Sequence, residues 1–453
     1  MSSELRKLWE HAGGQLPDDW TIVSLESLLR DSKSIAVGVM YPGPDTPGGT
    51  PLLKVGDIKD GAAIRPSYCI SVATDEEHRR TKLIGDELLI TLVGNPGECV
   101  VVTPEMAGWN PARAIAVVRL QDTSLRTYLK TVLESTAGRH LIDAVLNTTV
   151  QKTLNLKDIR KLPIPLPTDA EIKWISGISE ALTTRITLLR ETNATLEAIA
   201  QALFKSWFVD FDPVRAKMEG RIPEGMDEDT ARLFPDALEE SELGLVPRGW
   251  VTSPIYDMAT FINGAAYKAF QPNAICNGRP IIKIAELKSG VTSQTAYSDV
   301  AMPEKYLIET GDILFSWSGN PDTSIDTFVW TYEPAWLNQH IFRVLPREPQ
   351  ERTFLLQILR HLKPVFTELA RNKQTTGLGH VTVADMKREL IAMPTAELLR
   401  QFDLSVGPIH ARIFENQTQA QTLATLRDTL LPRLISGQLR LPEAQAAAEE
   451  VLA

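Results

Sequence analysis

The sequence predicts a mixed α+β protein in which two similar globular domains are joined by two long antiparallel coiled-coil helices, with an approximate two-fold axis. Two observations support this prediction. Four blocks of sequence recur in the same order at a spacing of about 227 residues, and a heptad pattern of apolar residues follows each copy. A repeat of this length indicates one domain used twice, because solenoid repeats span only about 20–50 residues.

The four repeated blocks read as strands and turns. Within each copy, strand patterns such as 87–93 and 114–120 alternate with Gly, Pro and Asn turns, and one helix is predicted at 124–146 and at 351–371. The paired blocks are LPDDWTIVSL (16–25) with LVPRGWVTSPI (245–255), TPLLKVGDIKDG (50–61) with RPIIKIAELKSG (279–290), IGDELLITLVGNPG (84–97) with TGDILFSWSGNPD (310–322), and DIRKLPIPLPT (158–168) with DMKRELIAMPT (385–395).

Two long helices are predicted at 171–207 and 398–434, each with a heptad seam. Asn193 and Asn416 are expected to be buried polar residues that fix the register, and Arg427 does not fit an apolar seam. The alternative is that each helix packs only on its own domain. The first seam contains Leu182, Ile186, Leu189, Asn193, Leu196, Ala200, Leu203 and Trp207, and the second contains Ile409, Ile413, Asn416, Ala420, Leu423, Arg427, Leu430 and Leu434.

The length of these helices predicts a fixed separation between the two domains. A helix of this size is roughly 55 Å long, which corresponds to at most about 15 base pairs of DNA. The expected boundaries are 1–168 for the first domain, 169–212 for the central helix, 213–244 for an acidic linker, 245–395 for the second domain, 396–441 for the C-terminal helix and 442–453 for a tail.

The charge of the chain is unevenly distributed. The formal net charge is -10, and residues 169–244 hold 16 of the acidic residues against 8 basic ones. The two large domains are therefore close to neutral, which permits a basic DNA-binding face on each without demonstrating one. Three widely spaced cysteines, together with the absence of an apolar signal or membrane segment, predict a reduced cytoplasmic protein.

No catalytic or metal site is predicted. The turns GNPG (94–97) and GNPD (319–322) begin like the Asn-Pro-Pro-Tyr loop of amino-methyltransferases, but both lack the second proline and the aromatic residue. No phosphate-binding Gly-rich loop with a terminal Gly-Lys-Ser or Gly-Lys-Thr occurs. Asp210 and Asp212 have no neighbouring His or third acid in the sequence, so a carboxylate site is disfavoured.

The aromatic segment SWFVDFDP (206–213) is expected to mark the end of the first long helix, with Pro213 stopping it. Its side chains are expected either to cap the helix pair or to dock a partner. The residues assigned to partner binding are Phe204, Trp207, Phe208, Asp210, Phe211, Leu434 and Ile435.

The chain resembles the specificity subunits of Type I restriction-modification enzymes. The resemblance covers nearly the whole chain and is most specific at 196–220 (LEAIAQALFKSWFVDFDPVRAKMEG) and at 422–441 (TLATLRDTLLPRLISGQLRL). It implies two target recognition domains that each read half of a bipartite DNA sequence. It also implies two methyltransferase subunits that use S-adenosylmethionine, and often restriction subunits that translocate DNA with ATP and magnesium. No cofactor is expected on this chain itself.

Candidate DNA contacts are polar and basic residues in turns at equivalent places of the two copies, because base edges are read by such side chains. Each could instead be a solvated loop residue, and His340 could be a core histidine. An alternative function is a scaffold without sequence readout, and a free-standing modification enzyme is disfavoured. The candidates are Lys54, Asn95, Arg113, Gln151 and Lys152 in the first domain and Lys283, Ser316, Asn320, Gln339, His340, Lys373, Gln374, Thr375, Thr376 and His380 in the second.

Overall fold

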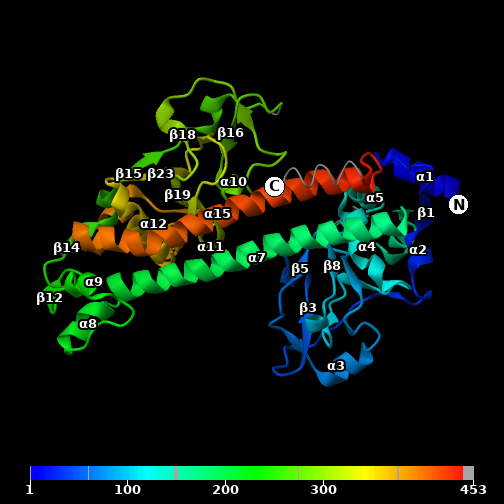
Figure 1. Cartoon of the computed structure of the whole chain (residues 1–453), viewed down its shortest axis with the longest axis horizontal. Helices are drawn as coiled ribbons and strands as arrows, with labels where there is room; N and C mark the ends of the chain where they lie inside the picture. The colour runs from blue at the N-terminus through cyan, green and yellow to red at the C-terminus, as the bar shows by residue number, and fades with distance from the viewer. Residues whose placement is uncertain (1, 60, 147–151, 274, 375–376, 442–453) are drawn as a thin grey trace. The chain divides into compact units, whose positions relative to one another are not determined.

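The computed structural model describes residues 2–59, 61–146, 152–273, 275–374 and 377–441. They form two compact units, one built from Met1–Ile186 with Thr422–Ala453 and the other from Thr187–Gln421. Two 40-residue helices, α7 (Asp169–Phe208) and α15 (Ala396–Ile435), contribute to both units (Figure 1). Both helices agree with the predicted ones to within two residues at each end. None of the described helices is long and apolar enough to cross a membrane.

The first unit is built on small sheets in which one strand pair is parallel and the others are antiparallel. Strands β7 (Leu88–Thr91) and β10 (Ile115–Val118) are buried at every position, in agreement with the predicted strands at 87–93 and 114–120. The four-stranded sheet has the order β2 (Ile35–Val37), β10 (Ile115–Val118), β7 (Leu88–Thr91) and β8 (Cys99–Val101). The other sheets are β6 (Cys69–Ile70), β3 (Thr50–Leu53) and β9 (Asn110–Pro111), the pair β1 (Thr21–Ser24) and β11 (Pro163–Leu166), and the pair β4 (Ile58–Lys59) and β5 (Ala62–Ala63).

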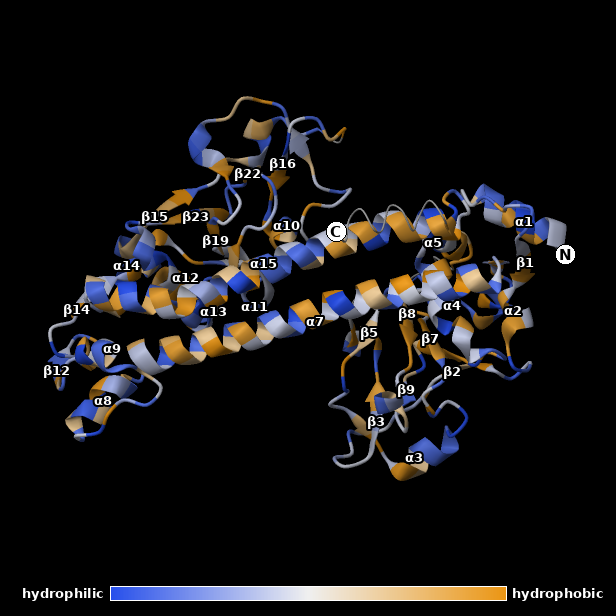
Figure 2. Cartoon of the chain, viewed as in Figure 1, coloured by the Kyte–Doolittle hydropathy of each residue, from blue (hydrophilic) through white to orange (hydrophobic). Residues whose placement is uncertain are grey.

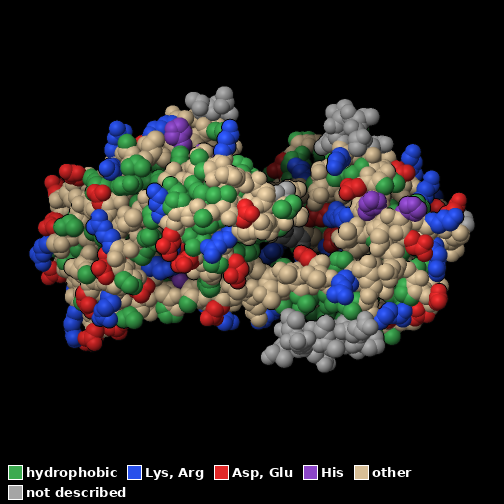
Figure 3. Space-filling model, turned by 90° about the horizontal axis from the view of Figure 1, so that it is seen from above, with side chains coloured by type: hydrophobic (Ala, Val, Ile, Leu, Met, Phe, Trp, Pro, Cys, Tyr) green, Lys and Arg blue, Asp and Glu red, His purple; other side chains and the backbone are tan. Residues whose placement is uncertain are grey.

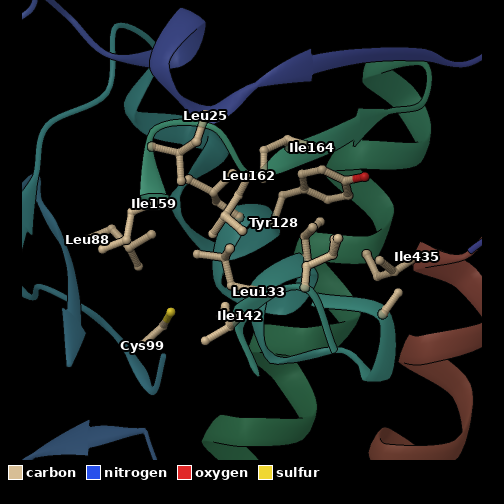
Figure 4. Close-up of a cluster of buried hydrophobic side chains, with 14 of the residues drawn as sticks. Leu25, Leu88, Cys99, Tyr128, Leu133, Ile142, Ile159, Leu162, Ile164 and Ile435 are labelled. Atoms are coloured by element: carbon tan, nitrogen blue, oxygen red, sulfur yellow. The ribbon is translucent and has the colours of Figure 1, made fainter. Parts of the chain in front are cut away.

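Short helices complete the first unit around its main apolar core. Tyr128 lies fully buried in this core and donates a hydrogen bond to the carbonyl oxygen of Pro165 at 2.8 Å. Figure 4 shows Tyr128 beside Ile164 of β11 and Ile435 of α15. The helices are α1 (Ser2–His11), α2 (Leu25–Leu28), α3 (Val72–Glu77), α4 (Arg126–Glu134), α5 (Thr136–Ala144) and α6 (Leu156–Ile159), with 3-10 turns at Val55–Asp57, Pro104–Met106 and Thr123–Leu125.

The second unit repeats the sheet order of the first. Its antiparallel sheet runs β15 (Ala259–Asn263), β23 (Ile341–Pro346), β19 (Ile313–Ser316) and β21 (Asp326–Val329). A second sheet contains β17 (Tyr297–Ser298), β16 (Arg279–Ile282), β22 (Ala335–Leu337) and β18 (Leu307–Ile308), and the strand pairs are β14 (Val251–Pro254) with β25 (Leu390–Met393) and β20 (Ser318–Gly319) with β24 (Gly379–His380). The matching strand orders confirm that one α+β domain is used twice.

Three helices of the second unit, α12 (Arg352–His361), α13 (Lys363–Asn372) and α14 (Val383–Arg388), correspond to α4, α5 and α6 of the first. The second unit also contains α10 (Ile284–Ser289) and α11 (Pro321–Ser324), with 3-10 turns at Ile255–Met258, Tyr267–Phe270, Glu304–Tyr306 and Pro349–Glu351. The predicted single helices at 124–146 and 351–371 are each broken in two. Ser135 starts α5 by accepting a hydrogen bond from the Gly138 amide at 3.1 Å, and Pro364 in the first turn of α13 has no amide hydrogen to continue α12.

The segment expected to be an acidic linker is folded. It forms α8 (Asp212–Met218), α9 (Glu228–Arg232) and a hairpin of β12 (Leu238–Ser241) and β13 (Gly244–Pro247). Helix α7 ends at Phe208, and Phe211 then adopts a left-handed conformation with φ of 56°. Pro213 lies in the first turn of α8, so the expectation that it stops the long helix is wrong: it begins the next helix instead.

The aromatic segment at the end of α7 forms the centre of the second unit. Phe208 packs edge-to-face against Phe354 of α12, with ring centroids 4.9 Å apart, and against Phe402 of α15 at 4.8 Å. Trp207 and Phe211 are also buried there, against Phe234 and Trp250. These contacts favour the helix-capping alternative and leave little aromatic surface for a partner to contact.

Leu434 and Ile435 are likewise buried, in the core of the first unit, and Asp210 pairs with Lys205. The partner-binding assignment of Phe204, Trp207, Phe208, Phe211, Leu434 and Ile435 is therefore corrected to a core role, because a side chain without exposed surface offers none to a partner.

Within the second unit, α7 and α15 pack against each other in antiparallel directions. Asn193 contacts Asn416, whereas Phe204, further along α7, contacts Phe402, which lies earlier in α15. Figure 2 shows apolar bands that alternate with polar ones along both helices. Every residue of the predicted seams is buried or half-buried, including the half-buried Arg427, which pairs with Asp428 at 2.8 Å.

Candidate nucleic-acid interface

Four turns of the first unit converge at one edge of its four-stranded sheet. The first turn follows β3, the second follows β7, the third precedes β10 and the fourth precedes α6. Two of the turns approach each other closely, because a Cβ added to Gly94 would lie 3.5 Å from the side chain of Val55. Three backbone hydrogen bonds join the turns, from the Ala112 amide to the Leu53 carbonyl at 2.9 Å, from Leu92 to Ala114 at 2.7 Å and from Leu154 to Leu92 at 2.9 Å.

The same four turns converge in the second unit. An added Cβ on Gly319 would lie 3.5 Å from Ile284, as for Gly94 and Val55. The equivalent backbone hydrogen bonds run from the Asn338 amide to the Ile282 carbonyl at 3.1 Å, from Trp317 to His340 at 3.4 Å and from Val381 to Trp317 at 2.8 Å. We call this edge of either unit the four-turn edge. In the first unit the four-turn edge comprises residues 53–55, 92–97, 112–114 and 152–154. In the second unit it comprises residues 282–284, 317–322, 338–340 and 379–381.

Four of the predicted contacts in the first unit lie on its four-turn edge. Arg113 and Lys152 are exposed, and Asn95 is exposed while donating a hydrogen bond to Glu98 at 3.2 Å. The ammonium group of Lys54 lies 3.4 Å from the ring centroid of Tyr68, a cation–π contact that positions the amine while leaving it charged. Gln151 lies outside the described residues.

The second unit places Lys283, Asn320, Gln339, His340 and His380 on its four-turn edge. Lys283 lies 5.4 Å from the ring of Tyr267, which parallels Lys54 and Tyr68. The Asn320 side chain accepts hydrogen bonds from the amides of Asp322 and Thr323 and so caps α11. Gln339 and His340 are half-buried, with Nε2 atoms 3.2 Å apart. Both remain partly accessible to a ligand.

Three further candidates differ from the prediction. Ser316 is 0% exposed, which argues against its assignment as a DNA contact, because its side chain faces the core of the sheet. Lys373 binds the carboxylate of Asp385 at 2.5 and 2.6 Å, so its charge is already neutralised by a nearly buried partner. Gln374 is exposed, and Thr375 and Thr376 lie outside the described residues.

Sequence reasoning missed the aromatic residues at the four-turn edge. Trp317 is half-buried beside His340, with ring centroids 5.7 Å apart, and its indole donates to the Asn263 side chain at 3.1 Å. Tyr68 and Tyr267 support the two lysines. Trp317 lies two residues before the GNPD turn in the sequence, and this proximity is a signal that could have included it among the candidates.

A basic hollow of about 810 Å³ lies in the first unit, at the end of β10 opposite the four-turn edge. Arg119 braces it by donating to the carbonyl oxygens of Arg80 at 2.6 Å and Lys82 at 2.9 Å and by pairing with the buried Glu87 at 2.9 Å. The charged residues that line the hollow are Arg30, Lys33, Arg79, Arg80, Lys82 and Arg119 with the single acid Asp31.

The surface of the molecule also carries regions of mixed charge. On the face seen in Figure 3, Lys and Arg side chains alternate with Asp and Glu over both units. Among the residues that the structure describes, no group of three or more His, Cys, Asp or Glu could hold a metal ion.

Comparison with known proteins agrees with this fold. Residues 247–406 match the family described as the Type I restriction modification DNA specificity domain. The chain is 26% identical over 357 residues to the HindI specificity subunit of a Haemophilus influenzae Type I restriction enzyme, covering 69% of this chain and 74% of that protein. It is 23% identical over 292 residues to the MjaIX specificity subunit of Methanocaldococcus jannaschii, covering 63% and 62%.

The fold is similar to a solved structure of the same class. The S subunit of the Type I restriction-modification system of M. genitalium superposes with a TM-score of 0.54 at 14% identity, covering 93% of this chain and 97% of that one. The duplicated fold and these matches make the chain similar to proteins described as DNA specificity subunits. Residues 247–406 therefore match the Type I specificity domain, and the chain is similar to Type I restriction enzyme specificity subunits, as its motifs predict.

Proposed function

We propose that each unit reads one half of a bipartite DNA target through its four-turn edge, and that the α7–α15 pair sets the unread gap between the halves. The observation that supports this most is the repetition of the four-turn edge, with equivalent backbone hydrogen bonds and a lysine held over a tyrosine in both units. Two similar edges with different side chains suit the reading of two different short sequences.

We infer that the chain is non-catalytic and that two methyltransferase subunits supply the chemistry with S-adenosylmethionine, with restriction subunits joining them. The buried aromatic segment is unsuited to docking, so the exposed faces of the long helices are the better candidates. In the second unit Leu188, Ile199 and Leu404 are 50%, 44% and 58% exposed on these helices, and exposed apolar side chains of this kind favour a partner surface. The cytoplasmic location stays a prediction.

The test is to express the chain with its methyltransferase in a host that lacks DNA methylation, and to map modified bases across the genome. A single split motif with an unread gap of fixed length is the expected result. A stable complex that modifies no motif would overturn sequence readout and favour the scaffold alternative.

The basic hollow is expected to contact phosphates rather than bases. Replacing both Arg79 and Arg80 by Ala should reduce the slope of log affinity against log salt by about 0.9 for each phosphate that the protein no longer neutralises, because fewer counterions are released. Preference among base sequences should stay unchanged. The measurement is DNA affinity of the assembled complex at several salt concentrations.

The matched control for this experiment is Arg232→Ala in the second unit, an exposed arginine paired with Glu228 and Asp229. It should leave the slope unaltered. An unchanged slope in the double variant would show that the hollow does not contact DNA.

A further inference from the structure

Two polar contacts join the long helices inside the second unit. Asn416 is 2% exposed and donates a hydrogen bond to the side-chain oxygen of Asn193 at 2.9 Å. The Asn193 amide in turn donates to the backbone carbonyl of Ile413 at 3.0 Å. The two asparagines thus satisfy each other within an otherwise apolar seam.

A cluster of further polar contacts, one helical turn further along α7, adds the recognition domain to the helix pair. Glu197 of α7 pairs with Arg360 of α12 and accepts a hydrogen bond from Gln357 at 3.2 Å. Gln357 is 1% exposed, and its amide nitrogen lies 2.8 Å from Nε2 of His410 on α15. Burial lowers the pKa of His410 to about 4, so this side chain is neutral near pH 7.

These contacts oppose sliding of one helix along the other. Apolar heptad seams tolerate a shift of one heptad, because apolar side chains again face apolar ones, whereas a buried asparagine is then separated from its partner. This separation leaves a buried polar group unsatisfied, which is costly. A heptad shift would move one helix by roughly 10 Å, or about three base pairs of DNA.

We propose that this register clamp, formed by Asn193, Asn416, Glu197, Arg360, Gln357 and His410, fixes the length of the unread gap in the DNA target. The proposal rests on the proposed function, because it assumes that the helix pair separates the two half-sites. The clamp joins α7, α15 and α12, so it holds the second recognition domain at one position along both helices. Its residues are positioning residues and contact no DNA.

The test uses the specificity subunit assembled with its methyltransferase and DNA duplexes that carry both half-sites at different gap lengths. The wild-type complex should bind duplexes of one gap length with at least about tenfold higher affinity than duplexes of any other gap length. The variant Asn193→Leu/Asn416→Leu, alone and combined with Glu197→Leu/Arg360→Leu, replaces each pair by apolar side chains. In both variants the preference for the wild-type gap over other gap lengths should fall below about threefold. New binding should occur to duplexes whose gap differs by about three base pairs.

The control is Thr192→Leu/Gln417→Leu, which adds leucines at exposed neighbouring positions on the same helices. It should keep the wild-type gap. A thermal unfolding curve establishes that each variant is folded, and the Asn double variant alone serves if the fourfold variant does not fold. A folded variant that binds only the original gap overturns the clamp. Failure of wild type to prefer any bipartite duplex would instead overturn the proposed function.

Discussion

Replacement of Phe208 by Ala is expected to destabilise the second unit by about 3–5 kcal/mol, the usual cost of removing a buried phenylalanine. Phe208 is 6% exposed and contacts aromatic rings from α12 and α15 at once. The cavity would therefore lie where the recognition domain joins both long helices. The measurement is denaturant unfolding of the whole chain, followed by the fluorescence of its nine tryptophans, which include Trp250 beside Phe208.

Thr195→Ala is the control, since Thr195 lies on the same helix, is exposed and is not among the side chains proposed to dock a partner. It should change the free energy of unfolding by less than about 0.5 kcal/mol. If Phe208→Ala leaves stability intact but abolishes methyltransferase binding, the core assignment is wrong and the docking alternative for this segment is restored.

Removal of basic and polar groups from one four-turn edge is expected to impair recognition of only one half of the target. Lys54→Ala/Arg113→Ala should affect one half-site and Lys283→Ala/Gln339→Ala the other. Loss of a side chain that reads a base should weaken the binding free energy by roughly 1–3 kcal/mol at one base pair of the target and relax the base preference at that position. The measurement is competition binding against duplexes in which every base pair of both halves is changed in turn.

Lys7→Ala provides the control for the first unit, because Lys7 is an exposed cation on α1, outside the four-turn edge. It removes a positive charge without changing base preference. Equal weakening of all duplexes by both double variants would mean that these residues contact phosphates only. Impaired recognition of both halves by either double variant would contradict independent reading by the two units.

The sequence predicted the duplicated fold well because the signals were local and repeated. The seams that end near Phe208 and Ile435 follow from heptad spacing alone, and the register role expected for Asn193 and Asn416 is matched by their mutual hydrogen bond. The break at Ser135 was missed because serine is tolerated inside a helix as well as at its start, whereas Pro364 is a helix-breaking signal that the single predicted helix at 351–371 overlooked.

The candidate site was harder to predict, because a polar residue in a turn carries no signal of what it already binds. Lys373 reads like a free cation, yet its partner Asp385 is twelve residues away. Ser316 reads like a turn residue but is the last residue of a fully buried strand. The aromatic segment at 204–211 reads equally as a docking surface and as a core, and only its contacts with residues some 150–200 positions away decide between them.

The strand pairs β1–β11 and β14–β25 have a consequence for how such chains diversify. Thr21 lies opposite Leu166, and Val251 lies opposite Met393, so each recognition domain enters and leaves at neighbouring points. A segment whose two ends lie side by side can be exchanged as a cassette with few new constraints on the scaffold that holds it. Under the proposed function, exchange of the segment between the two strands of one pair would change one half of the DNA target and leave both long helices unaltered.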